Sequence, residues 1–163
     1  MKCKNFLAML LPMIMLGACA TYHDDRTVEI KKENLDNVLL TLHGEYRVKD
    51  SRNDQNKITF VRVVSSSKAV AVELSNNEGM GFILNGVNCT GYYGEYGKHF
   101  RLFCDNTSGV TSAFFIEKLA AARAVTDGAM IGGFKPMTVE EGSYLINYSS
   151  LNGRPYYFVL EKK

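Results

Sequence analysis

The 163-residue chain contains no tryptophan, only three prolines and only three histidines. It also lacks a hydrophobic run long enough to cross a bilayer as a helix, which takes about 20 residues. Its apolar stretch at residues 6–16 is about half as long as that and contains Pro12. The Gly-x-Ser-x-Gly, phosphate-loop and His-Glu-x-x-His patterns are absent as well. We therefore predict that the protein is not an enzyme and uses neither a cofactor nor a metal.

The first residues have the pattern of a secretory signal peptide. Lys2 and Lys4 give a positive start, residues 6–16 are apolar, and small residues precede a polar stretch. The end of the apolar run, Leu16-Gly17-Ala18-Cys19, resembles the lipobox of bacterial lipoproteins. The resemblance implies cleavage before Cys19 and acyl chains on its sulfur and amine. Cleavage at the same place without lipidation is the alternative.

Acyl chains would anchor the mature chain to a membrane. Each buried methylene contributes about 0.8 kcal/mol, so two or three chains hold a protein stably where one does not. In lipoproteins of this type, an aspartate after the lipidated cysteine favours retention in the inner membrane, and Ala20 stands there instead. In a host with two membranes the resemblance therefore implies the outer membrane, and we expect the domain on its periplasmic face.

The formal net charge of +2 belongs to the signal peptide. Without residues 1–18, the Lys and Arg count falls from 19 to 17, which equals the count of Asp and Glu. A neutral domain gives no electrostatic reason for nucleic-acid binding. We expect the polar residues 19–36 to form a lipidated tether and residues 37–163 to form one β-rich domain.

Two cysteines are left in the domain once the signal peptide is removed and Cys19 carries lipid. In an oxidising compartment we expect Cys89 and Cys104 to form a disulfide. A loop of about fifteen residues makes such a bond worth about 3 kcal/mol. A zinc site with His43 or His99 is the alternative, but the close spacing that zinc ligands favour is missing.

Alternation of polar and apolar residues predicts strands over most of the domain. The predicted strands cover residues 38–49, 58–64, 69–74, 80–84, 110–116 and the hairpins at 88–106 and 143–162. A helix over residues 29–42 is the alternative to the first strand. Residues 117–126 form either a short helix or a strand pair that turns at Asp127-Gly128. Short strands between Gly, Asn, Asp and Ser clusters favour an all-β fold, a small antiparallel barrel or sandwich built from hairpins.

The central hairpin is the most distinctive segment. A turn centred on Tyr96-Gly97 predicts a register that aligns aromatic, charged and disulfide pairs. The predicted pairs are Tyr92 with Arg101, Tyr93 with Phe100, and Cys89 with Cys104. Such a two-residue loop places the cysteines at a hydrogen-bonded pair, where the Cα atoms are farther apart. A longer loop or a bulge is therefore the alternative.

Tyr92, Tyr93 and Tyr96 near the tip of this hairpin are the candidate binding surface. Tyrosine offers a rigid ring with a polar end, which suits stacking on a sugar or on a partner protein. The alternative is that Tyr92 and Tyr93 only cover the two faces of the sheet.

Asn152-Gly153 predicts the last hairpin. Pairing across a two-residue turn would place Tyr148 opposite Tyr157 and Ile146 opposite Val159.

These patterns lead us to expect a lipid-anchored envelope protein with a non-enzymatic binding or assembly role in the periplasm. Its expected partners are the membrane and an envelope protein or glycan. A carrier of an apolar ligand is one alternative, since small barrels can enclose a ligand. Another is an inhibitor of an envelope-attacking enzyme such as lysozyme, because some bacterial inhibitors are similar in size, anchor and disulfide.

Overall fold

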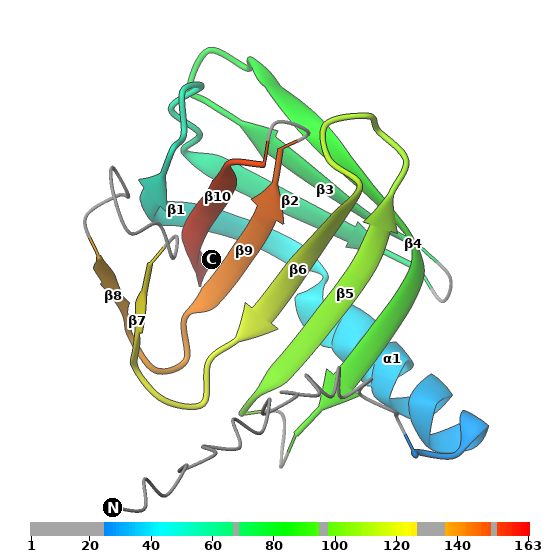
Figure 1. The fold of residues 1–163 in the computed structure, drawn as a ribbon. Helices are drawn as coiled ribbons and strands as arrows, with labels where there is room; N and C mark the ends of the chain where they lie inside the picture. The colour runs from blue at the N-terminus through cyan, green and yellow to red at the C-terminus, as the bar shows by residue number, and fades with distance from the viewer. Residues whose placement is uncertain (1–24, 67–68, 95–97, 127–135, 151–152) are drawn as a thin grey trace, which may run out of the picture.

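The computed structural model describes residues 25–66, 69–94, 98–126, 136–150 and 153–163. Eight strands form a closed antiparallel barrel, a two-stranded sheet lies beside it, and one helix packs against one end (Figure 1). The helix α1 spans Val28–Leu42, and the strands are β1 (Gly44–Arg52), β2 (Phe60–Ser65), β3 (Val70–Ser75), β4 (Gly81–Tyr93), β5 (Phe100–Asn106), β6 (Ala113–Lys118), β7 (Arg123–Val125), β8 (Met137–Val139), β9 (Tyr144–Ser149) and β10 (Pro155–Lys162). The all-β prediction is confirmed, as a barrel rather than a sandwich.

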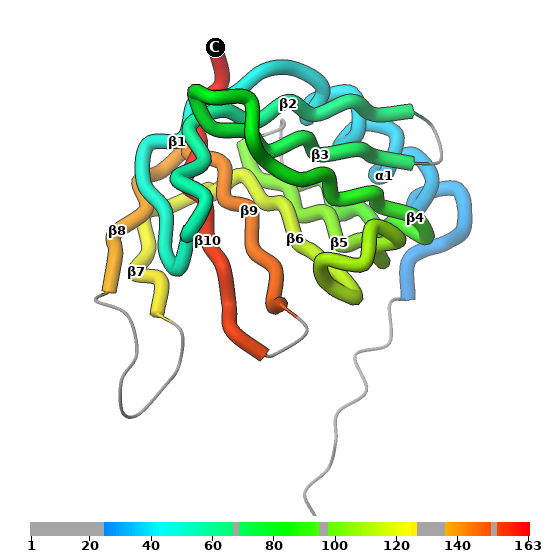
Figure 2. The backbone as a smooth tube through the Cα atoms, turned by 90° about the horizontal axis from the view of Figure 1, so that it is seen from above, coloured from blue at the N-terminus to red at the C-terminus, as the bar shows by residue number. Residues whose placement is uncertain are grey.

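The strands follow one another around the barrel in chain order, with one insertion. Their order is β1-β10-β9-β6-β5-β4-β3-β2, and β2 pairs with β1. The β7–β8 pair is inserted in the chain between β6 and β9, and Figure 2 shows it to one side of the barrel. The first strand, β1, pairs with the last, β10, and this contact closes the barrel, with Tyr46 opposite Lys162.

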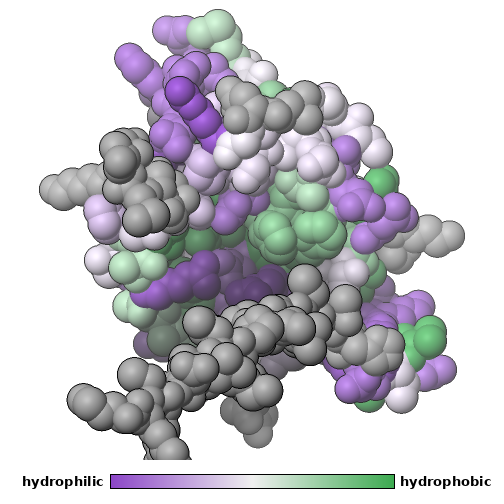
Figure 3. Space-filling view, viewed as in Figure 1, coloured by the Kyte–Doolittle hydropathy of each residue, from purple (hydrophilic) through white to green (hydrophobic). Residues whose placement is uncertain are grey.

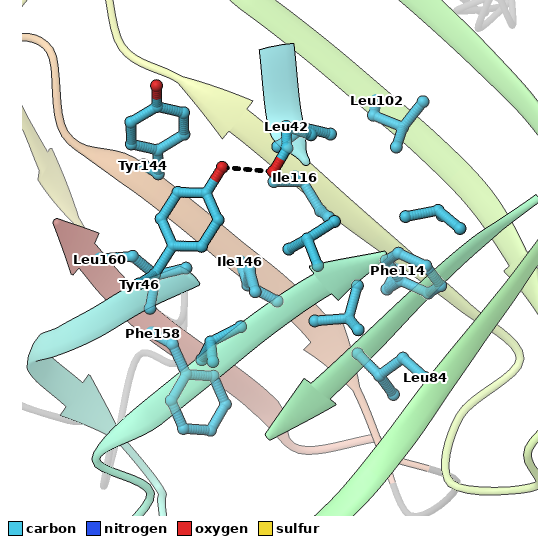
Figure 4. Close-up of a cluster of buried hydrophobic side chains, with 14 of the residues drawn as sticks. Leu42, Tyr46, Leu84, Leu102, Phe114, Ile116, Tyr144, Ile146, Phe158 and Leu160 are labelled. Carbon is cyan, nitrogen blue, oxygen red and sulfur yellow. Dashed lines mark hydrogen bonds between the residues drawn. The ribbon is translucent and has the colours of Figure 1, made fainter. Parts of the chain in front are cut away.

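Large apolar side chains fill the interior of the barrel. The largest fully buried ones are Tyr46, Phe100, Phe114, Phe158, Leu42, Leu74, Leu84, Leu102, Ile116, Ile146 and Leu160. Burying a side chain of this size contributes about 1.5–3 kcal/mol. Val38, Leu39 and Leu42 of the helix belong to the same cluster as the barrel residues (Figure 4). The helix therefore closes one end of the barrel and shares its core.

The helix corrects two predictions. It takes up residues 28–36 of the expected tether, and residues 38–42 continue it instead of beginning a strand. Its N-terminus is capped by Thr27, whose hydroxyl accepts a hydrogen bond from the N–H of Ile30 at 3.3 Å. The packed residues Leu35, Val38, Leu39 and Leu42 have helical spacing. The burial of these four side chains against the barrel outweighs the polar–apolar alternation that predicted a strand from residue 38.

The helix approaches β4 so closely that only glycine fits at position 91. A Cβ atom on Gly91 would lie 2.7 Å from the Cα of Leu35. Backbone cannot move aside as a flexible side chain can. Gly91 therefore sets how deeply the helix sits in the end of the barrel.

No helix forms at residues 117–126. The chain there leaves β6 at Lys118 and enters β7, which pairs with β8. The pair covers the outer face of β9 and β10 with a second, smaller core: Leu119, Val125, Met137, Val139, Leu145, Tyr157 and Val159. This packing overrides the helix propensity of the alanines. The turn predicted at Asp127-Gly128 lies outside the described residues.

The predicted disulfide is confirmed. Cys89 and Cys104 are bonded, with their Cα atoms 4.2 Å apart. The confirmed cross-strand pairs are Tyr92 with Arg101 and Tyr93 with Phe100. A bulge between Val87 and Thr90 includes Asn88 at a φ of 50°, so the cysteines are not held at the wide spacing of a regular hydrogen-bonded pair.

The predicted register of the last hairpin is wrong by one residue. Tyr148 lies opposite Tyr156 rather than Tyr157. The N–H of Ser150 donates to the carbonyl of Arg154, so three residues rather than two form the turn, and Gly153 takes the left-handed conformation with a φ of 82°. A shift of one residue exchanges the faces of a strand. Tyr156 therefore belongs to the barrel core, and Tyr157 packs under the β7–β8 pair.

Candidate functional site

The end of the barrel opposite the helix carries a pocket, which we call the mouth pocket. It has a volume of about 280 Å³ and is lined by Asp54, Gln55, Asn56, Phe82, Val110, Tyr148, Ser150 and Tyr156. These residues come from the β1–β2 loop, β4, the β5–β6 loop and the β9–β10 hairpin, which meet at the top of Figure 1. Pockets for drug-sized ligands measure about 300–1,000 Å³, so this one suits a small molecule or one unit of a larger one.

Aromatic rings form one wall of the mouth pocket. Tyr148 and Tyr156 stack with their planes 2° apart and their centroids 4.9 Å apart. The ring of Phe82 meets that of Tyr148 edge-on, with centroids 5.8 Å apart. Phe158 lies on the core side of Tyr148, with centroids 6.3 Å apart. The wall is therefore the outer layer of the barrel core.

Strand geometry explains why these rings share a face. Tyr148 and Tyr156 are directly opposite each other across β9 and β10, and side chains at opposed positions point to the same side of a sheet. Residues two apart on one strand also share a face, which puts Phe158 behind Tyr156. Tyr148 is almost fully buried, while Phe82 and Tyr156 are half-buried. The half-buried rings are the ones that a ligand would meet.

Burial raises the pKa of the Tyr148 hydroxyl well above its usual range, and Tyr156 and the carboxylate of Asp54 add to the shift. The hydroxyl therefore stays protonated at neutral pH. It is able to donate or accept a hydrogen bond but not to act as a base.

The polar side of the pocket is the β1–β2 loop, and hydrogen bonds hold it in place. The carboxylate of Asp54 accepts the N–H of Ile58 at 2.6 Å through Oδ2 and that of Asn56 at 3.1 Å through Oδ1. Outside the pocket, the amide of Asn53 donates to the carbonyl of Pro155 at 2.6 Å. These contacts fix the loop relative to β10. They leave the side-chain amides of Gln55 and Asn56 at the rim.

The tyrosines predicted as a binding surface do not form one surface. Tyr92 is on the outside of β4 and is 48% exposed, while Tyr93 is partly buried against the barrel core. The guanidinium carbon of Arg26 lies 5.7 Å from the centre of the Tyr92 ring. Tyr96 lies outside the described residues. Tyr92 and Tyr93 therefore cover opposite faces of the sheet, which was the alternative to a shared binding surface.

The other predicted site residues lie away from the mouth pocket. Cys104 is fully buried in the core, and the disulfide with Cys89 leaves the zinc alternative without thiolate ligands. Cys19 lies outside the described residues. In the parts of the chain that the structure describes, no group of three or more His, Cys, Asp and Glu side chains is placed to hold a metal ion.

Exposed hydrophobic side chains on the helix are a second surface feature. Val28 and Leu40 are each 77% exposed, and Ile30 is 46% exposed. Figure 3 shows green side chains at the lower right, where α1 lies in Figure 1, beside purple ones. Single exposed residues of this kind are common on soluble domains. Leu40 also lines a pocket of about 320 Å³ between the helix and the end of β2, together with Asp36, Leu39, Ser65 and Ser66.

Sequence reasoning missed the mouth pocket because its residues are far apart in the chain. Asp54, Phe82, Val110 and Tyr156 meet only once the barrel has closed. The alternation of polar and apolar residues around Phe82 does predict that this ring faces the core. The sequence-based register of the last hairpin, however, places Tyr157 instead of Tyr156 opposite Tyr148.

Comparison with known proteins gives no relative: no family model, no curated protein and no solved structure matches this chain. Within the described ranges, no helix combines the length and hydrophobicity that crossing a membrane would need.

Proposed function

We propose that this chain is a bacterial envelope lipoprotein, anchored to the outer membrane through Cys19, that binds one sugar-like ring of an envelope glycan in its mouth pocket. The role is binding or assembly on the periplasmic side, without catalysis. The observation that carries the proposal is the stacked pair Tyr148–Tyr156 beside a rim of amide, hydroxyl and carboxylate groups.

A sugar ring matches both parts of this pocket. Its C–H faces are apolar and stack on aromatic rings, while its hydroxyl groups point outward from the edge of the ring and need hydrogen-bond partners. Gln55, Asn56 and Ser150 offer such partners around the half-buried rings. A purely apolar ligand would offer these polar groups no hydrogen bond.

The position of the pocket also fits a tethered protein. Arg26, near the start of the described chain, donates a hydrogen bond to the carbonyl of Gly91 near the end of β4. Phe82 of the mouth pocket lies nine positions earlier on the same strand. At about 3.3 Å per residue, the two points are roughly 25–30 Å apart. A chain anchored through Cys19 would therefore hold the mouth away from the membrane.

The two alternatives have less support. A carrier of an apolar ligand needs room inside the barrel, and here large side chains such as Phe100, Phe114 and Phe158 occupy the interior. An enzyme inhibitor would use a protruding loop such as residues 94–97, of which only Gly94 is described.

Glycan binding is tested by isothermal titration of the disulfide-bonded chain, residues 20–163, with soluble peptidoglycan fragments and simple hexoses. We expect weak, saturable binding that Tyr156→Ala reduces by about 5- to 10-fold, the loss of one stacked ring. Tyr92→Ala is the matched control, since it removes an exposed tyrosine at the other end of the barrel. Equal loss in both variants, or none in Tyr156→Ala, would contradict the proposed site.

Anchoring has a separate test. Cys19→Ser should move the protein from the membrane fraction to the soluble fraction, and intact-mass spectrometry should detect the acyl chains only when Cys19 is present. Membrane retention by the Cys19→Ser variant would contradict a lipid anchor there.

A further inference from the structure

Asp54 gives the mouth pocket a single sign of charge. Among the described residues that line the pocket, Asp54 alone is charged, and the others are aromatic, aliphatic, amide or hydroxyl side chains. Arg52, Lys57 and Arg154 are the basic residues nearest to the lining residues along the chain. None of them is part of the lining, and Arg52 pairs with Asp50 at 2.5 Å. Within the described parts of the chain, no lysine or arginine forms an ion pair with Asp54.

The carboxylate of Asp54 is held in place but keeps acceptor capacity. Each oxygen accepts one backbone N–H, from Asn56 at 3.1 Å and from Ile58 at 2.6 Å. An ionised carboxylate has about four acceptor positions, so about two remain. Asp54 is half-buried, and its charge therefore acts through a medium less polar than bulk water.

The aromatic wall favours the same kind of ligand as the carboxylate. The face of an aromatic ring is negative, and a cation within about 6 Å of the ring centre is attracted to it. Tyr156 and Phe82 present half-buried rings to the pocket beside Asp54. A cation in the pocket would meet the carboxylate of Asp54 beside these aromatic rings, whereas an anion would be repelled by the carboxylate.

From this arrangement we infer that the mouth pocket selects ligands that carry a positive charge, either an amino sugar with a free amine or a quaternary ammonium group. The inference rests on the proposed function for the choice of a sugar and extends it by stating the charge of the ligand. An N-acetylated or neutral sugar would keep the stacking contact but lose the contact with Asp54.

The test compares four probes on the disulfide-bonded chain, residues 20–163, at low ionic strength: glucosamine, N-acetylglucosamine, glucose and choline. We expect glucosamine to bind about 5- to 10-fold more tightly than N-acetylglucosamine, and choline to bind as well. Raising the salt concentration should reduce this ratio, because screening weakens the contact between charges.

Asp54→Asn should bring the ratio close to one, because it lowers the affinity for glucosamine more than the affinity for N-acetylglucosamine. Asparagine keeps an acceptor oxygen for the loop, and the melting temperature of the variant checks that the loop holds. Asp50→Asn is the control, because this carboxylate is not part of the pocket lining and already contacts Arg52.

The outcomes separate this inference from the proposed function. Equal affinity for glucosamine and N-acetylglucosamine overturns the charge selection but leaves glycan binding in place. Choline binding without any sugar binding supports the charge selection and contradicts the glycan proposal. The absence of binding by all four probes contradicts both.

Discussion

The hydroxyl group of Tyr46 in β1 donates a hydrogen bond to the carbonyl oxygen of Leu42, the last residue of α1. Both residues are fully buried (Figure 4). The last carbonyl groups of a helix have no partner within the helix, and this one would otherwise lie unpaired in the core. The bond therefore joins the end of the helix to the first strand of the barrel.

Replacing Tyr46 by phenylalanine should reduce the free energy of unfolding by about 1–3 kcal/mol, the cost of leaving a buried acceptor unsatisfied. Denaturant titration measures this change. Tyr92→Phe is the control, because Tyr92 is largely exposed, and its effect should stay within about 0.5 kcal/mol. An unchanged midpoint for Tyr46→Phe would show that the bond contributes nothing to stability.

Buried tyrosines should make the protein sensitive to alkali. Burial raises the pKa of Tyr46, Tyr144 and Tyr148, and neighbouring Tyr144 adds to the shift of Tyr46. In the unfolded chain the same hydroxyls ionise near pH 10. Above that pH the folded state binds more protons than the unfolded state, so stability falls as the pH rises, by up to about 1.4 kcal/mol per pH unit for each tyrosine. Below pH 10 these groups make no pH-dependent contribution.

A spectrophotometric titration checks this prediction. The chain has nine tyrosines, and in denaturant all of them should ionise in one step near pH 10. In the folded protein, Tyr46, Tyr144 and Tyr148 should ionise only as the protein unfolds. A single step near pH 10 in the folded protein would contradict their burial.

Removing the disulfide should cost about 3 kcal/mol, the value for a loop of about fifteen residues. Because Cys104 is fully buried, the double variant Cys89→Ala/Cys104→Ala is preferable to serine, which would bury a hydroxyl. Denaturant titration of this variant and of the reduced wild-type chain should give similar losses. A loss below about 1 kcal/mol in both would mean that the bond adds little to this hairpin.

Glu117 joins the β7–β8 pair to the barrel. Its side chain is 9% exposed and pairs with Arg101 at 3.3 Å and with Arg123 of β7. Glu117→Gln should cost about 1 kcal/mol, since both arginines are partly exposed and can return to water. Hydrogen exchange should increase first at β7. Glu73→Gln, in the exposed pair with Arg62, is the control and should leave exchange at β7 unchanged.

The barrel was predictable from sequence because its signals are local. The alternation of polar and apolar residues in β3 and β4 can be seen within a few neighbouring positions. The pairing of Cys89 with Cys104 can be inferred within one hairpin. The helix was harder, since Val38, Leu39 and Leu42 fit a helix only once the barrel end that they cover is known. The helix propensity of residues 117–126 was misleading for the same reason, because packing against β9 and β10 determines the conformation of that segment.

The candidate site depended on a detail that sequence patterns fix poorly. One extra residue in the turn before Arg154 moved Tyr156 into the mouth and Tyr157 under the β7–β8 pair. The tyrosine-rich tip was conspicuous in sequence, yet alternation along β4 separates Tyr92 from Tyr93.

The pairing of β1 with β10 sets the order in which the chain can complete its fold. Tyr46 and Lys162 are opposed although they are more than a hundred positions apart, so the barrel stays an open sheet until its C-terminal strand arrives. Contacts of such long range slow folding, because a long loop must close before they form. A chain that lost residues 155–163 would leave edges of both β1 and β9 unpaired and ready to associate with other copies. Both of these edges should therefore stay exposed until residues 155–163 pair with β1 and β9.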